Sequence, residues 1–342
     1  MYILITDNIF QQFRDLIENS KQISLIAHPN PDGDALGSSL AMYHALHSFK
    51  NLRVIVPNSF PSFLEWMPGT DQIMIFDHQF RQAESFIKSS DLIICLDFNT
   101  LKRIDRIAPI IKASGAKCVL IDHHLEPDPD FDLAISNIHA SSTSELVFDV
   151  IEKLGYLPQD IAAFSSCIYV GIMTDTGSFS YSCNHGRPYE ITAFLVDKGL
   201  DVAHIHNLVY DTFSESRIRL LGHLLNKRMK VIPEYRAAFI SLSMADQKKY
   251  NYQVGDSEGI VNYALSIQGI RLAAFFTEKP ELVRVSLRSK GNLSVNLLAR
   301  KYYHGGGHKN AAGGNSYNTI RKAEIEFRKI LEENKVLLQN ES

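Results

Sequence analysis

One histidine and two aspartates stand close together near the start of the chain, at His28, Asp32 and Asp34. The apolar run Ile23–Ala27 before them predicts a buried strand, and the apolar side chains over 36–46 have helical spacing. Residues between a strand and the following helix lie in the crevice where open α/β sheets bind ligands. An imidazole and two carboxylates at that point predict a binding site for a hard cation that in turn binds a phosphate group.

Two other apolar runs lead directly into residues of the same kinds. The run over 92–96 is followed by Asp97, and the run over 118–121 is followed by Asp122, His123 and His124. A charged residue straight after a buried strand stands at the carboxyl edge of its sheet. These residues are therefore expected to converge with the first group on one rim.

Asp175 adds a fifth carboxylate, since it follows a helical pattern over 161–173. Five carboxylates within a few ångströms repel one another strongly unless cations neutralise them. Carboxylates and imidazoles without thiolates favour Mn²⁺, with Mg²⁺ as the second choice, and disfavour structural zinc. Six or seven donors exceed the needs of one ion. They predict two metal ions about 3.5–4 Å apart, sharing a carboxylate and activating a bridging water for attack on phosphorus.

The bulk composition limits the class of protein. A chain of 342 residues is long enough for two domains with separate cores. No apolar run approaches the ~20 residues of a membrane span, and the N-terminus lacks a secretory pattern. The four cysteines lie far apart, which favours free buried thiols over a disulfide or zinc site. These features predict a cytoplasmic protein.

The hydrophobic pattern predicts an α/β fold with two domains. Strands are predicted at 23–27, 52–56, 72–76, 92–96 and 118–121, and at 229–232, 237–242, 270–277 and 282–289. The first set alternates with helical patterns and indicates a doubly wound, mostly parallel sheet; the second indicates a smaller α/β domain with a mixed sheet. Ser142 to Glu145 has the pattern of a capping box at a helix start. We expect a catalytic domain over 1–200, a linker over 201–228 with a long helical pattern at 202–227, and a substrate-binding domain over 229–342.

The C-terminal part carries a local positive charge. The net charge of −3 argues against binding long duplex nucleic acid, but residues 282–323 contain eight Lys or Arg and no Asp or Glu. Within this window, Gly305, Gly306 and Gly307 would let the backbone approach an anion closely. Arg288, His304 and His308 can add charge-assisted hydrogen bonds. The window therefore favours a short anionic ligand.

The motifs together resemble those of the DHH phosphoesterase superfamily. The N-terminal resemblance rests on the segments around His28–Ser38, Asp97, Asp122–His124 and Asp175. In the second half, Glu258–Tyr263, Ser286–Ser289 and Gly305–Gly314 resemble the DHH-associated domain of NrnA-type nanoRNase/pAp-phosphatases. The resemblance covers nearly the whole chain.

The resemblance implies a role for each candidate residue. One manganese would be held by His28, Asp32 and Asp97, and a second by Asp34, Asp97, His123 and Asp175. His124 would contact the scissile phosphate or protonate the leaving oxygen, and Asp122 would orient the imidazoles. The glycine run would grip the terminal phosphate or base of the substrate, in a cleft between the domains. A homodimer is the assembly that the family favours.

The activity implied is Mn²⁺-dependent cleavage of short oligoribonucleotides and pApA-type dinucleotides to mononucleotides, together with removal of the 3′-phosphate from pAp (3′-phosphoadenosine 5′-phosphate). Alternatives within the superfamily are a cyclic or linear dinucleotide phosphodiesterase, an inorganic pyrophosphatase, an exopolyphosphatase and a RecJ-type exonuclease. RecJ-type enzymes generally lack the His28 equivalent, and pyrophosphatases are expected to carry a basic cluster where this chain has Gly-Gly-Gly-His. A nucleotide-binding module without catalysis is the alternative outside enzymes; it has no need of so many metal-ligand side chains.

Overall fold

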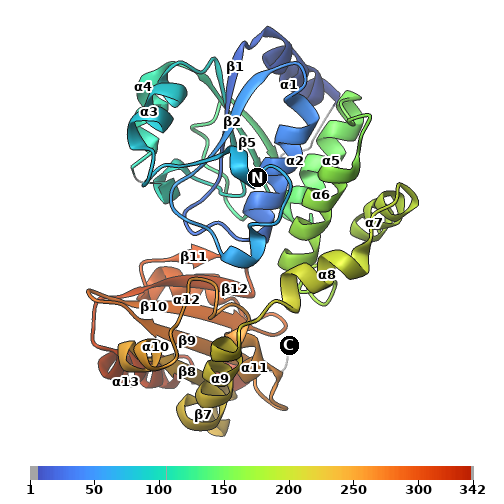
Figure 1. The fold of residues 1–342 in the computed structure, drawn as a ribbon. Helices are drawn as coiled ribbons and strands as arrows, with labels where there is room; N and C mark the ends of the chain where they lie inside the picture. Colours follow the sequence, from blue (N-terminus) through green and yellow to red (C-terminus); the bar gives the residue numbers. More distant parts are fainter. Residues whose placement is uncertain (1–6, 105, 340–342) are drawn as a thin grey trace. The chain divides into compact units, whose positions relative to one another are not determined.

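A computed structural model describes residues 7–104 and 106–339, and the chain forms two compact units (Figure 1). The first unit ends at Thr212 and the second begins at Phe213. Among the described residues, no helix is long and apolar enough to cross a bilayer.

The first unit is built on a six-stranded sheet in the order β3-β2-β1-β4-β5-β6, and every pairing is parallel. Its strands are β1 (Gln22–Ile26), β2 (Asn51–Val56), β3 (Ile73–Ile75), β4 (Leu92–Leu96), β5 (Lys117–Asp122) and β6 (Leu133–Ser136). The direction of winding reverses between β1 and β4. This point is the topological switch point, where doubly wound sheets form their ligand crevice.

Both faces of this sheet are buried, because side chains alternate between them along each strand. In β4, Leu92, Ile94 and Leu96 belong to one core, and Ile93 and Cys95 to the other. The first core is covered by α1 (Asp7–Asn19), α2 (Gly33–Leu46), α5 (Thr143–Leu154) and α6 (Ala162–Asp175), with α7 (Arg187–Asp197) and α8 (Val202–Tyr210) outside them. Figure 1 shows α3 (Phe80–Lys88) and α4 (Ala108–Ser114) on the opposite face. Burial on both faces explains why these strands read as continuous apolar runs.

The second unit is a mixed sheet in the order β11-β12-β10-β9-β8-β7, in which only β8 and β9 pair in parallel. Its strands are β7 (Lys230–Ile232), β8 (Ala237–Leu242), β9 (Leu272–Glu278), β10 (Val283–Ser289), β11 (Gly306–Gly307) and β12 (Ala311–Ser316). The α/β fold with a parallel and a mixed sheet is the predicted one.

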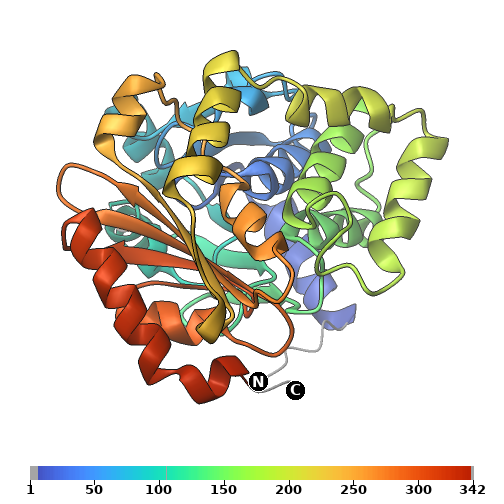
Figure 2. The ribbon, with the colours of Figure 1, turned by 90° about the horizontal axis from the view of Figure 1, so that it is seen from below.

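Helices cover both faces of the mixed sheet as well. One core is closed by α12 (Val295–Tyr302), α13 (Ile320–Glu333) and α14 (Lys335–Gln339), and the other by α9 (Glu215–His223), the π-helical turn Leu224–Arg228 and α11 (Ile260–Ser266). The short helix α10 (Met244–Lys249) follows β8. Figure 2 shows α13, in red, lying along the sheet.

One local prediction is wrong, and three strands were not predicted. The helical pattern over 202–227 is not continuous: α8 ends at Tyr210 and α9 begins at Glu215, with the Ser214 hydroxyl accepting the Arg217 amide as its N-cap. The division between the units falls in this break. The strands β6, β11 and β12 are absent from the predicted set. Of these, β11 and β12 consist mostly of Gly and Ala, residues with little intrinsic tendency to form strands.

Candidate metal centre

The predicted metal ligands of the first unit come together at the switch point of its sheet. His28 follows β1, Asp97 follows β4, and His123 follows β5. Asp34 lies in the first turn of α2, and Asp175 is the last residue of α6. Neighbouring parallel strands therefore bring together residues that lie far apart in the sequence.

Asp32 combines a structural contact with a position at the cluster. Its Oδ1 accepts hydrogen bonds from the amides of Asp34 at 3.1 Å and Ala35 at 3.0 Å, which caps the N-terminus of α2. Its Oδ2 lies 3.8 Å from His28 Nε2. The cap fixes the carboxylate so that its second oxygen faces the histidine.

Asp97 is the central carboxylate. Its Oδ2 lies 3.3 Å from His28 Nε2, and its Oδ1 lies 3.7 Å from His123 Nε2. The backbone of Asp97 is left-handed, with φ of 65°, a conformation that costs energy for a residue other than glycine. The strained backbone places a buried carboxylate between two imidazoles.

Both of these imidazoles are oriented by backbone carbonyls. Nδ1 of His28 lies 2.9 Å from the Pro29 carbonyl oxygen, and Nδ1 of His123 lies 3.2 Å from that of Ala140. Because a carbonyl oxygen only accepts, each Nδ1 carries a proton, and each Nε2 points at the carboxylates. Histidine ligands of metal ions are typically oriented in this way.

A second group forms around His123. Its Nε2 lies 3.4 Å from Asp175 Oδ2 and 3.8 Å from Asp34 Oδ2. The potential ligand atoms of Asp34, His123 and Asp175 all lie within 4.8 Å of one another, as do those of His28, Asp32 and Asp97. Each group has the donors to hold one cation, and Asp97 Oδ1 also reaches towards the second group.

Burial and mutual repulsion shift the pKa values of the clustered carboxylates and of the histidine among them. Burial, reinforced by the charges of Asp97 and Asp175, raises the pKa of Asp34 well above its usual range. Burial also raises the pKa of Asp175 to about 6, with His123 opposing the shift. Burial lowers the pKa of His123, but the surrounding aspartates outweigh it and raise the pKa to about 9. Cations would relieve this repulsion, so the oxygen and nitrogen donors present fit divalent metal ions.

Asp122 and His124 form a pair beside this cluster. Asp122 Oδ1 lies 2.7 Å from His124 Nδ1, and Asp122 Oδ2 accepts a hydrogen bond from the His124 amide at 3.0 Å. Asp122 is fully buried, and His124 Nδ1 also lies 3.7 Å from Asp97 Oδ1. The carboxylate holds a proton on Nδ1, so Nε2 is the ring nitrogen suited to exchange a proton with a substrate.

The sequence interpretation missed the contacts of the α5 N-terminus with this cluster. The amides of Thr143 and Ser144 donate to Asp34 Oδ2 and Oδ1 at 2.7 and 2.8 Å, and the Thr143 hydroxyl donates to Asp97 Oδ1 at 2.9 Å. Ser142 is the helix N-cap, as predicted. The available signal was the run of four hydroxyl residues over 141–144 before an apolar helix.

Glu145 does not complete the predicted capping box. Its buried Oε2 accepts hydrogen bonds from the Ser141 amide at 2.9 Å and the Ser141 hydroxyl at 2.6 Å. Its Oε1 lies 3.0 Å from His185 Nε2. Glu145 therefore binds one residue before the cap and ties α5 to the loop after α6.

The candidate substrate residues of the second unit lie on adjacent strands and their connections. Arg288 of β10 is paired with Ala311 of β12, and Gly306 and Gly307 form the edge strand β11. His304 precedes this strand, and the His308 amide after it donates to the Ala311 carbonyl at 2.7 Å. The structure brings them into one region of the sheet.

The glycine run has a packing role that was not predicted. A Cβ atom at Gly305 would lie 1.9 Å from the Gly313 carbonyl oxygen, and one at Gly307 would lie 2.6 Å from that of Ala311. The Gly305 amide already donates to the Ala299 carbonyl. Gly305 and Gly307 are therefore required for the close approach of this segment to β12, whereas a Cβ atom at Gly306 would make only an ordinary contact, 3.5 Å from Asn296 Oδ1.

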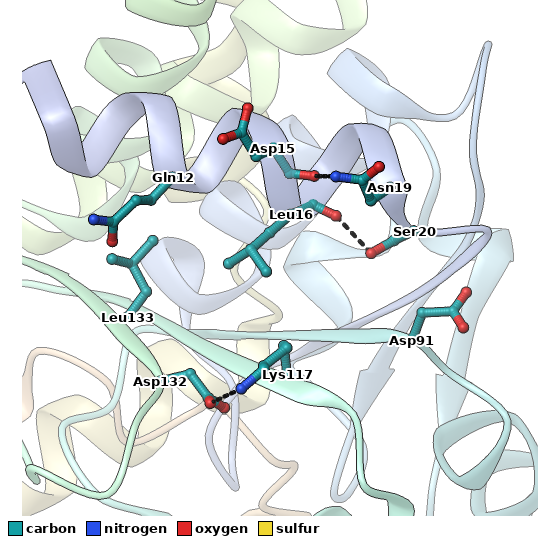
Figure 3. A pocket seen from close by; sticks show the side chains of 9 residues that line it. All are labelled: Gln12, Asp15, Leu16, Asn19, Ser20, Asp91, Lys117, Asp132 and Leu133. Carbon is teal, nitrogen blue, oxygen red and sulfur yellow. Dashed lines mark hydrogen bonds and ion pairs between the residues drawn. The ribbon is translucent and has the colours of Figure 1, made fainter.

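A hollow of about 470 Å³ lies at the opposite, amino edge of the first sheet (Figure 3). Two of its carboxylates bind backbone amides: Asp91 accepts hydrogen bonds from those of Lys21 and Gln22, and Asp132 accepts one from that of Cys118 and also binds the Lys117 ammonium. This hollow is distinct from the metal-ligand cluster.

Comparison with known proteins agrees with this architecture. The N-terminal domain of the DHH family matches residues 22–172, and the DHHA1 domain matches residues 237–337. The bifunctional oligoribonuclease and PAP phosphatase NrnA of Bacillus subtilis is 29% identical over 300 residues, which cover 86% of this chain and 90% of that protein. Its namesake from Thermus thermophilus is 26% identical over 292 residues, 85% of this chain and 83% of that protein.

One solved structure has a higher sequence identity to this chain than these two relatives. The exopolyphosphatase-related protein of Bacteroides fragilis is 44% identical, with a TM-score of 0.93 over 99% of this chain and 100% of that one. The two-domain fold and the carboxylate–imidazole cluster, together with these matches, define a metal-dependent phosphoesterase. The chain belongs to the DHH family and carries a DHHA1 domain in its second unit.

Proposed function

We propose that this phosphoesterase cleaves short oligoribonucleotides to mononucleotides and converts pAp to AMP, with Mn²⁺ as its metal. The convergence of six metal-competent side chains at one sheet edge carries the proposal, because such a cluster suits hydrolysis at phosphorus. The activities named for the Bacillus subtilis and Thermus thermophilus relatives supply the substrate class.

In this proposal the two ligand groups hold one metal ion each. His28, Asp32 and Asp97 would hold the first, and Asp34, Asp97, His123 and Asp175 would hold the second. When bound, the metal ions would supply positive charge to the phosphate and an activated water as the nucleophile. Mg²⁺ is the second choice, because it prefers an all-oxygen shell to one containing imidazoles.

The remaining pair of the cluster, His124 and Asp122, transfers a proton to the leaving group. His124, oriented through Nδ1 by Asp122 at 2.7 Å, protonates the leaving oxygen through Nε2. In the second unit, Arg288, His304, His308 and the backbone of Gly306 and Gly307 bind the far end of a short nucleotide substrate, while the Gly305 amide donates to the Ala299 carbonyl. The acid-free stretch over 282–323 supports an anionic ligand there.

A second candidate function is hydrolysis of polyphosphate. It is favoured by the 44% identity to a protein described as exopolyphosphatase-related. The cluster suits attack on a phosphoanhydride as well as on a phosphoester, since both reactions place negative charge on phosphoryl oxygens.

The experiment that separates these functions is a product analysis of the purified protein with Mn²⁺. Separate reactions contain pApA, pAp, a five-nucleotide RNA, pyrophosphate and a short polyphosphate, and products are resolved by anion-exchange chromatography. We expect AMP from pApA and pAp, and mononucleotides from the RNA. Hydrolysis of polyphosphate alone would support the second candidate, hydrolysis of pyrophosphate alone would indicate an inorganic pyrophosphatase, and no product from any of the five would contradict both candidates.

Arg288→Ala is expected to raise KM for pAp about tenfold while changing kcat less than about twofold, because it removes a charged contact made equally in ground and transition states. Steady-state kinetics measure both constants. Arg284→Ala is the matched control, since Arg284 points to the same face of β10 and is exposed. An equal effect of both substitutions would indicate general loss of positive charge, and a fall in kcat alone would contradict the binding role.

A further inference from the structure

Thr143 makes contacts that its place at a helix start does not require. Its hydroxyl donates to Asp97 Oδ1 at 2.9 Å, and its amide donates to Asp34 Oδ2 at 2.7 Å. Asp34 belongs to α2, and Asp97 follows β4, so one residue of α5 connects carboxylates from two other elements. Thr143 and both aspartates are buried.

We propose that Thr143 is a positioning residue, which holds the carboxylates of Asp34 and Asp97 in the orientation that binds the two metal ions. The inference rests on the proposed function, since it assigns a role toward the proposed metal ligands. It adds a residue that contacts no metal and no substrate but sets the angle between two ligands.

The hydroxyl of Thr143 helps to determine which oxygen of Asp97 faces each of the two ligand groups. A carboxylate turns about its last side-chain bond over a broad range, so its orientation is set by its hydrogen bonds. With Oδ1 held by Thr143, Oδ2 faces His28 Nε2 at 3.3 Å and Oδ1 stays 3.7 Å from His123 Nε2. Each oxygen therefore faces a different ligand group. Loss of the hydroxyl removes one of the contacts that limit this rotation and leaves the contact with His28.

The helix start fixes Asp34 in a similar way. Thr143 and Ser144 donate one amide hydrogen to each oxygen of the Asp34 carboxylate, at 2.7 and 2.8 Å. The N-terminal end of α5 also favours negative charge, which opposes the protonation that burial promotes. Each oxygen retains a second lone pair for a cation.

Threonine suits this position better than serine. Its branched Cβ restricts the side chain to few rotamers, so the hydroxyl direction is largely fixed before a metal binds. Valine has the same shape without the hydroxyl, and serine keeps the hydroxyl with more freedom. Substitution of Thr143 by valine and by serine therefore distinguishes the effect of the hydrogen bond from that of side-chain packing.

The test is calorimetric titration of Mn²⁺ into the metal-free full-length protein. Wild type is expected to bind two ions, and Thr143→Val to bind them with dissociation constants raised about 10- to 100-fold, the usual cost of removing a residue that orients metal ligands. Thr143→Ser is expected to stay within about threefold of wild type. The same loss should appear as a higher Mn²⁺ concentration for half-maximal activity, with KM for pAp unchanged.

The matched control is Ser142→Ala. The Ser142 hydroxyl accepts the Glu145 amide and caps the same helix without a hydrogen bond to either carboxylate. This variant is expected to melt at a lower temperature and to bind Mn²⁺ like wild type. Circular dichroism verifies folding, and Thr143→Ala replaces Thr143→Val should the valine variant be unfolded.

The outcomes distinguish the positioning role of Thr143 from the proposed metal dependence. Wild-type affinity in Thr143→Val, or in Thr143→Ala where that variant is used, would overturn the positioning role while leaving the metal centre intact. Equal losses in Thr143→Val and Ser142→Ala would also overturn it, because the effect would then be one of helix stability. A wild-type protein that binds no Mn²⁺ would overturn both the positioning role and the proposed metal dependence.

Discussion

Asp97→Asn is expected to lower turnover of pAp at least about a thousandfold, equivalent to roughly 4 kcal/mol of transition-state stabilisation, and to abolish binding of the Mn²⁺ pair. The oxygens of Asp97 face His28 at 3.3 Å and His123 at 3.7 Å, so its charge is the one that both proposed metal sites share. Asparagine has the same size and tolerates the left-handed backbone found at this residue. The variant should therefore fold normally, which circular dichroism can verify beside kinetics and Mn²⁺ titration.

Asp91→Asn is the matched control for this substitution. Asp91 stands at the other end of the same strand, where it accepts the amides of Lys21 and Gln22. Loss of its charge is expected to reduce stability slightly and leave turnover unchanged. Normal rates in Asp97→Asn would remove Asp97 from the proposed metal site, and an equal fall in both variants would point to the fold instead.

Gly171→Ala is the second substitution with a large expected effect. Gly171 lies in α6, and a Cβ atom there would lie 2.5 Å from Ser144 Cβ and 2.8 Å from Asp34 Oδ1. Neither contact is tolerable, so α6 must move away from α2 and α5. We expect a loss of about 1–3 kcal/mol in the free energy of unfolding and weaker Mn²⁺ binding, because Asp34 and Asp175 separate. Urea denaturation and calorimetry measure the two effects.

Gly222→Ala tests whether any helical glycine responds in this way. Gly222 lies in α9, and no atom beyond the adjacent residues and the backbone of that helix lies within 4 Å of the position that a Cβ would occupy. Alanine there is expected to raise stability by about 0.4–1 kcal/mol, through the lower entropy of the unfolded chain. Wild-type stability and Mn²⁺ affinity in Gly171→Ala would show that the helix crossing accommodates a methyl group and would contradict the steric argument.

The parallel sheet and its rim of ligands were predictable because their pattern is local. Strand β4 occupies the predicted residues 92–96, and β1, β2 and β5 lie within one residue of their predicted bounds. A strand buried on both faces is a short apolar run, and the charged residue that ends it must reach the sheet edge. Asp97 and Asp122–His124 could therefore be placed at one edge from the sequence alone.

The hydrogen bonds that hold the proposed metal ligands in place could not be predicted, because they depend on burial and on contacts between distant segments. Thr143 and Ser144 read as ordinary residues of a helix start, and their fully buried contacts with Asp34 depend on how α5 packs against α2. In the same way, β12 is a strand because β10 pairs with it, despite a sequence of Ala, Gly, Asn and Ser. Tertiary pairing outweighs local preference there.

The order in which the ligands occur along the chain has a consequence for how the protein acquires activity. The cluster draws on segments from His28 to Asp175, joined through parallel pairings of β1 with β4 and β4 with β5. Such pairings close long loops and form slowly compared with local helices. A growing chain therefore has no complete centre until α6 has been synthesised and has docked. Binding of the proposed metal ions would then require the finished topology of the first unit, and it would stabilise that unit against unfolding.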